Sequence, residues 1–483
     1  MIAELRRKLD AKEISAVELA RHYIDRISRL DGKLESYLHV SETVLEDAKE
    51  AQKRIDAGES ETFTGIPTGL KDNLCTIGMP TTCASKMLEG FASPYDATVV
   101  AKLRKQGAVF LGKLNMDEFA MGATTQTSYY KKTKNPFDLG RVPGGSSGGS
   151  AAAVSADLCA FALGSDTGGS IRQPASFCGV TGHRPTYGMV SRYGCVAFAS
   201  SLDQIGPLAS SAEDCALVLE AISGPDGFDR TSMRSPGFMA SKFASGLKKL
   251  ESLAGMRIAI INELVGPSVE RETKDAVLEA AKWFEKNGAV VERISMPMLA
   301  HAVPAYYLIS SAEASTNLAR FDGVRYGHRT ASPGSYEDLI QLSRAEGFGW
   351  EVKRRILLGS YALCSGYYDD YYKKAVRLAD ELKVTYAAVF KNYDAILSPA
   401  SPMPAFAIDE VPSDPAQLYL ADICTASAPL AGLPSVSTPC GMTSGGLPIG
   451  LMITCPRWAD DVALSLAGAF EKDRKRPIPG ALE

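Results

Sequence analysis

Glycine is concentrated in one segment of the chain. Residues 138–188 hold eleven of the 43 glycines in 483 residues, and most of these lie in two clusters, 143–150 and 164–172. Glycine lets the backbone approach a ligand closely and adopt conformations that other residues avoid. The apolar run Ala151–Leu163 between the clusters favours a helix, so this segment is not a flexible glycine–serine linker. We therefore expect both clusters to be ordered loops in a folded core.

The glycine clusters do not carry a phosphate-binding motif. Neither contains G-x-x-x-x-G-K-[ST], and neither matches G-x-G-x-x-G after a strand. The second cluster instead places Ser170 directly after Gly168 and Gly169. Acyl transfer needs a nucleophile beside N–H donors that stabilise the oxyanion of the tetrahedral intermediate. The pattern predicts a serine hydrolase site in which Thr167, Gly168 and Gly169 supply those N–H groups and Ser170 attacks a carbonyl.

A nucleophilic serine needs a base, and the residues alone leave two candidates open. His183 is the nearest histidine in sequence, although the G-x-S-x-G elbow of the α/β-hydrolases is absent. Lys71 lies in a turn bounded by glycine and proline, at 65–74. A lysine acts as a base only when burial lowers its pKa toward neutrality.

The pattern of apolar residues predicts an α/β protein. The first 60 residues are expected to be helical, with a capping box at Ser15 and Glu18 and a second helix at 41–55. From Phe63 onward, short apolar runs alternate with helical patterns. Strands are expected at 257–262, 289–294, 394–398, 435–438 and 449–454, with a helix at 273–287. The stretch 257–294 therefore reads as a β-α-β unit, and we expect a large mixed sheet between layers of helices.

The chain shows no internal repeat and no strong linker, which favours a single domain over 1–483. Within it we expect a helical N-terminal segment at 1–60, a catalytic core at 63–210 and a helical insertion at 300–390. Residues 225–255 and 400–418 are rich in proline, serine and glycine and are expected to be loops.

Charge and cysteine usage exclude several classes of protein. The net charge is −4, which argues against nucleic-acid binding by global charge. The N-terminus has no apolar core typical of a secretory signal, and the weakly polar stretch 148–164 is too short and too polar to span a bilayer. The ten cysteines form no C-x-x-C pair and the five histidines form no close pair. We expect a cytoplasmic protein with reduced thiols, no metal site and no membrane contact.

Three stretches together resemble the amidase signature family. They are Gly-Ile-Pro-x-Gly-x-Lys-Asp-Asn at 65–73, Gly-Gly-Ser-Ser-Gly-Gly-Ser at 144–150 and Gly-x-Asp-x-Gly-Gly-Ser-Ile-Arg-x-Pro at 164–174. The family uses a Ser–cis-Ser–Lys triad. By position, the resemblance implies that Ser170 is the nucleophile, Ser146 the bridging serine and Lys71 the base. It also implies a cis peptide bond between Gly145 and Ser146.

Further stretches resemble the members of this family that hydrolyse glutamine for tRNA-dependent amidation: 114–122, 200–207, 321–327, 352–356 and 430–434. The resemblance covers about residues 5–475. It implies that Arg355 binds the α-carboxylate of glutamine, that Asp422 binds its α-ammonium and that Tyr306 lines the pocket. It further implies two partners in a heterotrimer. One is a B subunit that uses ATP and Mg²⁺ to amidate misacylated Glu-tRNA(Gln), and the other is a small C subunit, with no cofactor in this chain.

Two other functions remain open at this point. A stand-alone amidase of lipid or aryl amides would use the same triad, but its pocket should be apolar and lack the Arg355 and Asp422 pair. A non-catalytic scaffold would keep the fold without the chemistry. The presence of Lys71, Ser146 and Ser170 argues against a scaffold.

Overall fold

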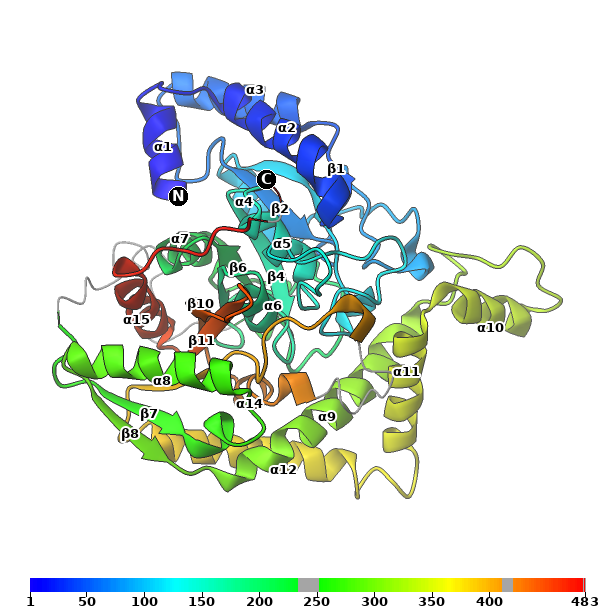
Figure 1. The fold of residues 1–483 in the computed structure, drawn as a ribbon. Helices are drawn as coiled ribbons and strands as arrows, with labels where there is room; N and C mark the ends of the chain where they lie inside the picture. Colours follow the sequence, from blue (N-terminus) through cyan, green and yellow to red (C-terminus); the bar gives the residue numbers. More distant parts are fainter. Residues whose placement is uncertain (233–251, 411–419, 481, 483) are drawn as a thin grey trace.

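One mixed β-sheet runs through the whole molecule (Figure 1). The computed structural model describes residues 1–232, 252–410, 420–480 and 482. Within these residues the eleven strands follow the order β1-β3-β2-β4-β6-β5-β10-β11-β9-β7-β8. β2 pairs in parallel with β3 and β4, β7 pairs in parallel with β8 and β9, and the remaining pairs are antiparallel. The strands are β1 Tyr37–Val40, β2 Pro67–Lys71, β3 Val109–Leu114, β4 Phe161–Asp166, β5 Thr181–Arg184, β6 Gln204–Ala209, β7 Arg257–Ile261, β8 Val290–Ile294, β9 Ala395–Pro399, β10 Ser435–Met442 and β11 Pro448–Thr454.

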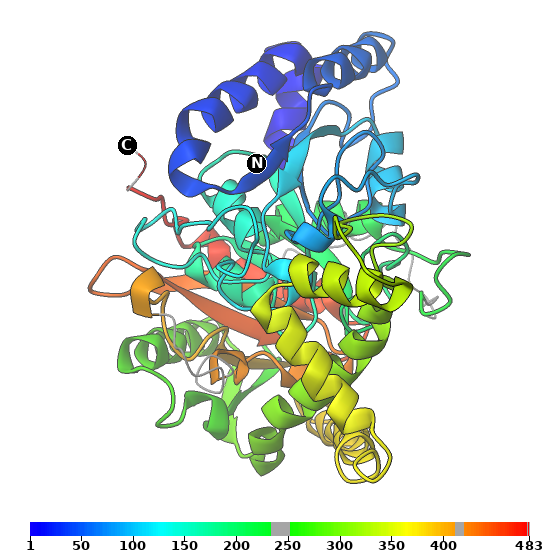
Figure 2. The same ribbon diagram turned by 90° about the vertical axis from the view of Figure 1, so that its right-hand side faces the viewer.

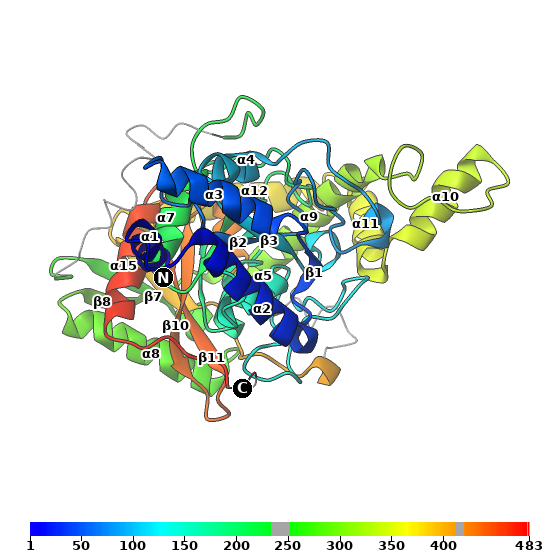
Figure 3. The same cartoon turned by 90° about the horizontal axis from the view of Figure 1, so that it is seen from above.

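Helices cover both faces of the sheet, which confirms the predicted α/β fold with a mixed sheet between helices (Figures 1 and 3). The helices are α1 Ile2–Asp10, α2 Ala16–Leu34, α3 Val44–Asp56, α4 Thr98–Lys105, α5 Gly148–Ser155, α6 Arg172–Phe177, α7 Ala212–Ile222, α8 Arg271–Lys286, α9 Ala302–Asn317, α10 Tyr336–Gly347, α11 Trp350–Leu363, α12 Tyr372–Val389, α14 Ser427–Ala431 and α15 Asp460–Lys472.

The N-terminal segment is mostly helical, as predicted. The capping box is present, because the Ser15 hydroxyl accepts the Glu18 N–H while the Glu18 carboxylate accepts the Ser15 N–H. The expectation of helix alone is wrong at Tyr37–Val40, which forms β1 and pairs antiparallel with β3. Four residues are too few for a period of two to be recognised, and the partner strand lies some 70 residues away.

The expectation that Ala151–Leu163 is one helix is also wrong. The helix α5 ends at Ser155 and β4 begins at Phe161. Both elements are completely buried, so apolar composition does not distinguish one from the other. Side chains distant in sequence bind the carbonyls at the end of the helix. Arg476 donates to those of Val154 and Ser155, and Arg26 donates to those of the next two residues, Ala156 and Asp157.

The predicted β-α-β unit is confirmed as β7, α8 and β8, with the two strands parallel. The strands predicted toward the C-terminus are β9, β10 and β11. β10 continues to Met442, beyond its predicted end, because its pairing with β11 carries on past an irregularity between Pro439 and Gly441. Parts of the predicted loops 225–255 and 400–418 lie outside the described residues.

The helices α9 to α12 account for the helical region expected at 300–390 (Figures 1 and 2). Inward side chains of α9, α11 and α12 form an apolar core of their own, together with residues from 83–121, 198–202, 259–264 and 426–433. A second, larger core lies around the sheet. The candidate site described below is built from elements that contribute to both of these cores.

Two further expectations concern the state of the thiols and the presence of membrane-spanning helices. All ten thiols are free, and eight of them are buried. In the part of the chain that the structure describes, no helix combines the length and the apolarity needed to cross a membrane.

The contact between α9 and α11 depends on Gly359. A β-carbon at this position would overlap the carbonyl oxygen of Ser311 on α9. We expect Gly359→Ala to destabilise the protein by about 1–3 kcal/mol, because the two helices would have to separate. Thermal unfolding followed by circular dichroism measures the effect as a lower Tm.

Gly468→Ala in α15 is the matched control. Only one atom lies within reach of an added β-carbon there, Ala212 Cβ at 3.9 Å. Alanine is the better helix former by about 1 kcal/mol, so this variant should melt at the wild-type temperature or above it. Equal Tm values for the two variants would contradict the packing argument.

Candidate active site

Lys71 is the last residue of β2, near the middle of the parallel strands β3, β2 and β4. It therefore lies at the carboxyl edge of these strands, where polar groups collect in α/β proteins. The expectation that Lys71 lies in a turn is wrong, because Pro67–Lys71 is a strand and the chain turns directly after it. The next residue, Asp72, accepts the N–H and the hydroxyl of Thr82 and pairs with Lys113 at 3.4 Å. This buried network fixes the point at which the chain leaves the strand after Lys71.

The Lys71 ammonium group is fully buried and donates to hydroxyl groups. Nζ lies 2.7 Å from Ser146 Oγ, 2.8 Å from Ser147 Oγ and 3.0 Å from Ser165 Oγ. Burial lowers the pKa of Lys71 from 10.5 to about 8, although nearby acidic groups oppose the shift. An amine with this pKa is partly neutral near pH 7 and can accept a proton.

Ser146 and Ser170 are brought together by the two glycine clusters. The Gly145–Ser146 peptide bond is cis, as the resemblance implies. The N–H of Ser147 donates to the Ser170 carbonyl at 3.1 Å, so the two clusters lie side by side. A β-carbon on Gly145 would overlap the Asp117 carboxylate, so this tight packing requires glycine.

A buried charge cluster holds the loop that carries Ser170. Asp166, at the end of β4, pairs with Arg172 through two contacts of 3.0 Å, and Arg184 donates to the same residue. Burial alone would raise the pKa of Asp166, but Arg172 and Arg184 outweigh it and lower the pKa to about 2. The carboxylate therefore stays charged and fixes both ends of the loop 167–171.

The loop backbone before Ser170 is closely packed. The ring of Tyr306 lies 2.5 Å from the place a β-carbon would take on Gly168, and Thr425 excludes one on Gly169. Among the described residues, no acceptor is recorded for the N–H groups of Thr167, Gly168 and Gly169. The assignment of these three groups as oxyanion donors stays a prediction. Ser170 itself is 7% exposed.

The residues predicted to bind an amino acid also converge. Arg355 lies on α11 and Asp422 on the short turn Leu420–Asp422, and both are nearly buried. Tyr307 on α9 joins them, because its hydroxyl donates to Asp422 at 2.6 Å while the Arg355 guanidinium lies 4.5 Å from its ring centre. Burial raises the pKa of Asp422, and the Tyr307 hydrogen bond and Arg355 oppose the shift. The adjacent Tyr306 links this charged pair to the loop at Gly168.

Several residues of the site were not singled out from the sequence. Ser147 and Ser165 bind the Lys71 amine, Tyr307 joins the two charges, and Glu351 binds the Arg355 Nε at 2.6 Å. Ser147 and Ser165 belong to the glycine clusters and could have been suspected. The role of Tyr307 has no signal in sequence, since its neighbour Tyr306 has the same chemistry.

The structure does not support His183 as the base. Its ring lies 3.0 Å from Asp460 and is fully buried beside α15. The basic group that contacts the Ser146 hydroxyl is the amine of Lys71. Within the described ranges, no three histidine, cysteine, aspartate or glutamate side chains are grouped closely enough to hold a metal ion.

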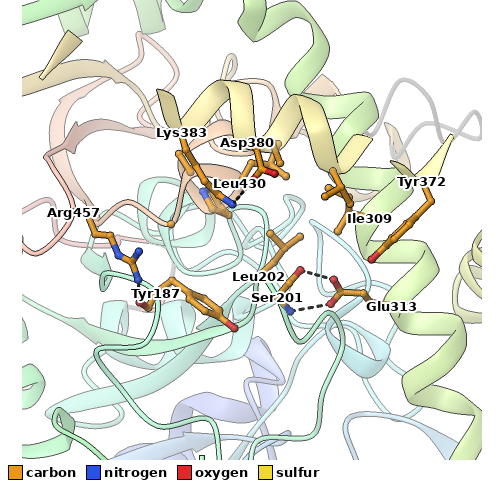
Figure 4. Close-up of a pocket in the computed structure, with 15 residues that line it drawn as sticks. Tyr187, Ser201, Leu202, Ile309, Glu313, Tyr372, Asp380, Lys383, Leu430 and Arg457 are labelled. Carbon is orange, nitrogen blue, oxygen red and sulfur yellow. Dashed lines mark hydrogen bonds and ion pairs between the residues drawn. The ribbon is translucent and has the colours of Figure 1, made fainter. Parts of the chain in front are cut away.

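A separate cavity of about 440 Å³ lies between α9, α12 and the end of α14 (Figure 4). Its walls include Tyr187, Leu202, Ile309 and Tyr372. At one side of the cavity, the Glu313 carboxylate accepts a hydrogen bond from the Ser201 N–H. None of the predicted site residues lines it. The cavity therefore lies outside the cluster around Lys71.

Comparisons with known proteins identify a family that this chain matches over most of its length. A family model described as Amidase matches residues 18–464. The chain is 54% identical over 473 residues to the A subunit of the Glutamyl-tRNA(Gln) amidotransferase of Ruminiclostridium cellulolyticum, covering 98% of this chain and 96% of that protein. It is 50% identical over 476 residues to the Nostoc protein of the same name, covering 98% and 97%.

Solved structures give the same result. The crystal structure of the Glutamyl-tRNA(Gln) amidotransferase A subunit from Thermotoga maritima has a TM-score of 0.80 at 41% identity, covering 97% of this chain and 94% of that one. The native peptide amidase from Stenotrophomonas maltophilia has a TM-score of 0.84 at 30% identity, covering 99% and 98%.

The pKa of Lys71 predicts how the reactivity of Ser170 depends on pH. The neutral amine is the form that accepts a proton, so reactivity should rise with pH through a midpoint near the Lys71 pKa of about 8. The rate of inactivation by a sulfonyl fluoride, corrected for hydrolysis of the reagent, measures this from about pH 6 to about pH 9.

Lys71→Arg should be unreactive across this range, because a guanidinium stays charged. Lys53→Arg on the exposed surface is the control and should keep the wild-type profile. A flat wild-type profile, or reactivity retained in Lys71→Arg, would contradict the assignment of Lys71 as base.

Proposed function

Since this chain belongs to the amidase family, we propose that it is the glutamine-hydrolysing subunit of a tRNA-dependent amidotransferase. In this role it supplies ammonia for the conversion of Glu-tRNA(Gln) to Gln-tRNA(Gln). Curated relatives with this activity in their names share about half of their residues with the chain over nearly its full length. The family match over 18–464 also supports a single amidase domain.

The observation that carries the proposal is the pair of opposite charges beside the serines. Arg355 and Asp422 are 3% and 9% exposed and both contact Tyr307. A free amino acid carries one negative and one positive charge, and a buried site must pair each of them. Arg355 binds the α-carboxylate of glutamine, Asp422 binds its α-ammonium and Tyr306 lines the pocket. The side-chain amide then points toward Ser170.

The reaction follows from the triad. Ser170 Oγ attacks the amide carbon of glutamine, and its proton passes through Ser146 to the neutral Lys71 amine. The N–H groups of Thr167, Gly168 and Gly169 stabilise the oxyanion. The carbon–nitrogen bond breaks as Lys71 returns the proton through Ser146, and ammonia leaves. Water then attacks the glutamyl ester by the same proton route and releases glutamate.

The partners follow from the fate of the ammonia. This chain makes ammonia but carries out no amidation, so a B subunit uses ATP and Mg²⁺ to activate the glutamyl group of Glu-tRNA(Gln). A small C subunit completes the heterotrimer. The misacylated tRNA binds mainly to the B subunit, which agrees with the net charge of −4 on this chain. The complex acts in the cytoplasm, and this chain needs no cofactor of its own.

A stand-alone amidase is the alternative that the same triad allows. The peptide amidase of Stenotrophomonas maltophilia shares the fold at 30% identity. Hydrolysis of hydrophobic amides with no response to glutamine would favour this alternative. The buried charged pair argues against it, because an apolar amide offers neither a carboxylate to Arg355 nor an ammonium group to Asp422.

Removal of the Ser170 hydroxyl separates ammonia production from its use. In the assembled complex, Ser170→Ala should lose glutamine-dependent amidation of Glu-tRNA by at least about a thousandfold, since the nucleophile is absent. Amidation with added ammonium chloride should continue at the wild-type rate. Formation of radiolabelled Gln-tRNA measures both reactions.

Ser150→Ala is the matched control from the same glycine-rich segment. The Ser150 hydroxyl donates to the Leu163 carbonyl at 3.1 Å and does not reach Lys71. This variant should keep both reactions. Glutamine-dependent amidation that survives in Ser170→Ala would show that another group is the nucleophile.

A further inference from the structure

Glu118 is a buried acid that takes no part in the triad. It lies on the short turn Glu118–Ala120 that follows β3 and is 2% exposed. The N–H of Gly349 donates to both carboxylate oxygens, at 3.1 and 2.9 Å, and the Ser85 hydroxyl donates to one of them. Burial raises the pKa of Glu118 to about 7, while the hydrogen bonds from Ser85 and Gly349 oppose the shift.

Gly349 is the N-cap residue of α11, and it has no side chain with which to cap the helix. Glu118 provides the cap from 231 residues away in the sequence. A carboxylate at this position also satisfies the positive end of the helix dipole. A β-carbon on Gly349 would overlap Glu118, so the glycine allows the close contact.

The same helix carries the carboxylate-binding residue of the site. Arg355 lies six residues after Gly349, which is about 9 Å along a rigid helix axis. Glu351 lies in the first turn and holds the Arg355 Nε at 2.6 Å. A shift or rotation at the start of α11 therefore moves Arg355 directly.

The residue before Glu118 contacts the loop of the bridging serine. The Asp117 N–H donates to the Ser146 carbonyl at 3.3 Å, and the Asp117 carboxylate accepts the Thr127 hydroxyl at 2.9 Å. The Glu118 N–H donates to the same Thr127 hydroxyl at 3.0 Å. Two adjacent residues thus connect the loop at Ser146 with the start of the helix that carries Arg355.

We propose that Glu118 is a positioning residue that fixes the start of α11 and thereby places Arg355 to bind the α-carboxylate of the substrate. The inference rests on the proposed function, because it takes glutamine as the substrate. It assigns Glu118 to substrate binding through Arg355 rather than to the chemistry at Ser170.

Glu118→Gln tests the proposal in the assembled complex. Glutamine keeps the size of the side chain and one acceptor oxygen but cannot ionise. We expect the KM for glutamine to rise about tenfold, with kcat changed by less than about threefold. Hydrolysis of butyramide, which has no α-carboxylate, should proceed with the wild-type kcat/KM. Amidation with added ammonia should also be unchanged.

Glu346→Gln is the matched control. Its carboxylate accepts hydrogen bonds from His328 and Thr330 near the end of α10 and does not contact α11. It should leave the KM for glutamine unchanged. Ser85→Ala serves as a second variant if Glu118→Gln folds poorly, since it removes one donor to Glu118 and should raise the same KM by about threefold.

The outcomes separate the two hypotheses. An unchanged KM for glutamine in both variants would overturn the role of Glu118 while leaving the proposed function intact. Equal losses on glutamine and butyramide would also overturn it, because the effect would then not pass through the α-carboxylate. No glutamine hydrolysis by the wild-type complex would overturn the proposed function, and this inference with it.

Discussion

The complete burial of the Lys71 amine is the constraint on which the rest of the site depends. An exposed lysine would be charged at neutral pH and could not act as a base. The protein surrounds this amine with the hydroxyl groups of serines instead of pairing it with a carboxylate. A direct ion pair would stabilise the charged form and raise the pKa, whereas neutral hydroxyls leave burial as the dominant influence. The position of Lys71 at the end of a central strand makes that burial possible.

The charged groups near this amine are held apart from it by partners of their own. Asp166 is bound by Arg172 and Arg184, and this fully buried cluster holds the loop of Ser170. Arg355 and Asp422 both contact Tyr307, and under the proposed function they bind the two charges of the substrate. Under the proposed function, the site divides into a neutral proton relay around Lys71 and a charged binding region around Tyr307, and Tyr306 packs against the backbone at Gly168 between them. Glu118 would connect the two regions, because it binds the start of α11 while the adjacent Asp117 contacts the loop at Ser146.

The sequence was most informative where local chemistry and a specific motif coincide. The β-α-β unit at 257–294 carries a strong local pattern and is confirmed. The two glycine clusters lie side by side, although α5 begins inside the first of them, and Lys71 ends β2 instead of lying in a turn. The strand Tyr37–Val40 and the end of α5 at Ser155 escaped prediction, because both are decided by distant partners, namely β3 and the side chains of Arg26 and Arg476. The same reason applies to Tyr307 and Glu118. Their roles come from contacts across more than a hundred residues of sequence, which no local pattern records.

The central claim is that Ser170 forms the covalent bond to the substrate while Ser146 only relays a proton. The most direct measurement is mass spectrometry of the complex quenched in acid during glutamine turnover, with fragmentation of the peptide 142–172 that contains both serines. The account predicts a glutamyl group on Ser170 that disappears in Ser170→Ala. A glutamyl group on Ser146, or no adduct on either serine while glutamine is being hydrolysed, would contradict it.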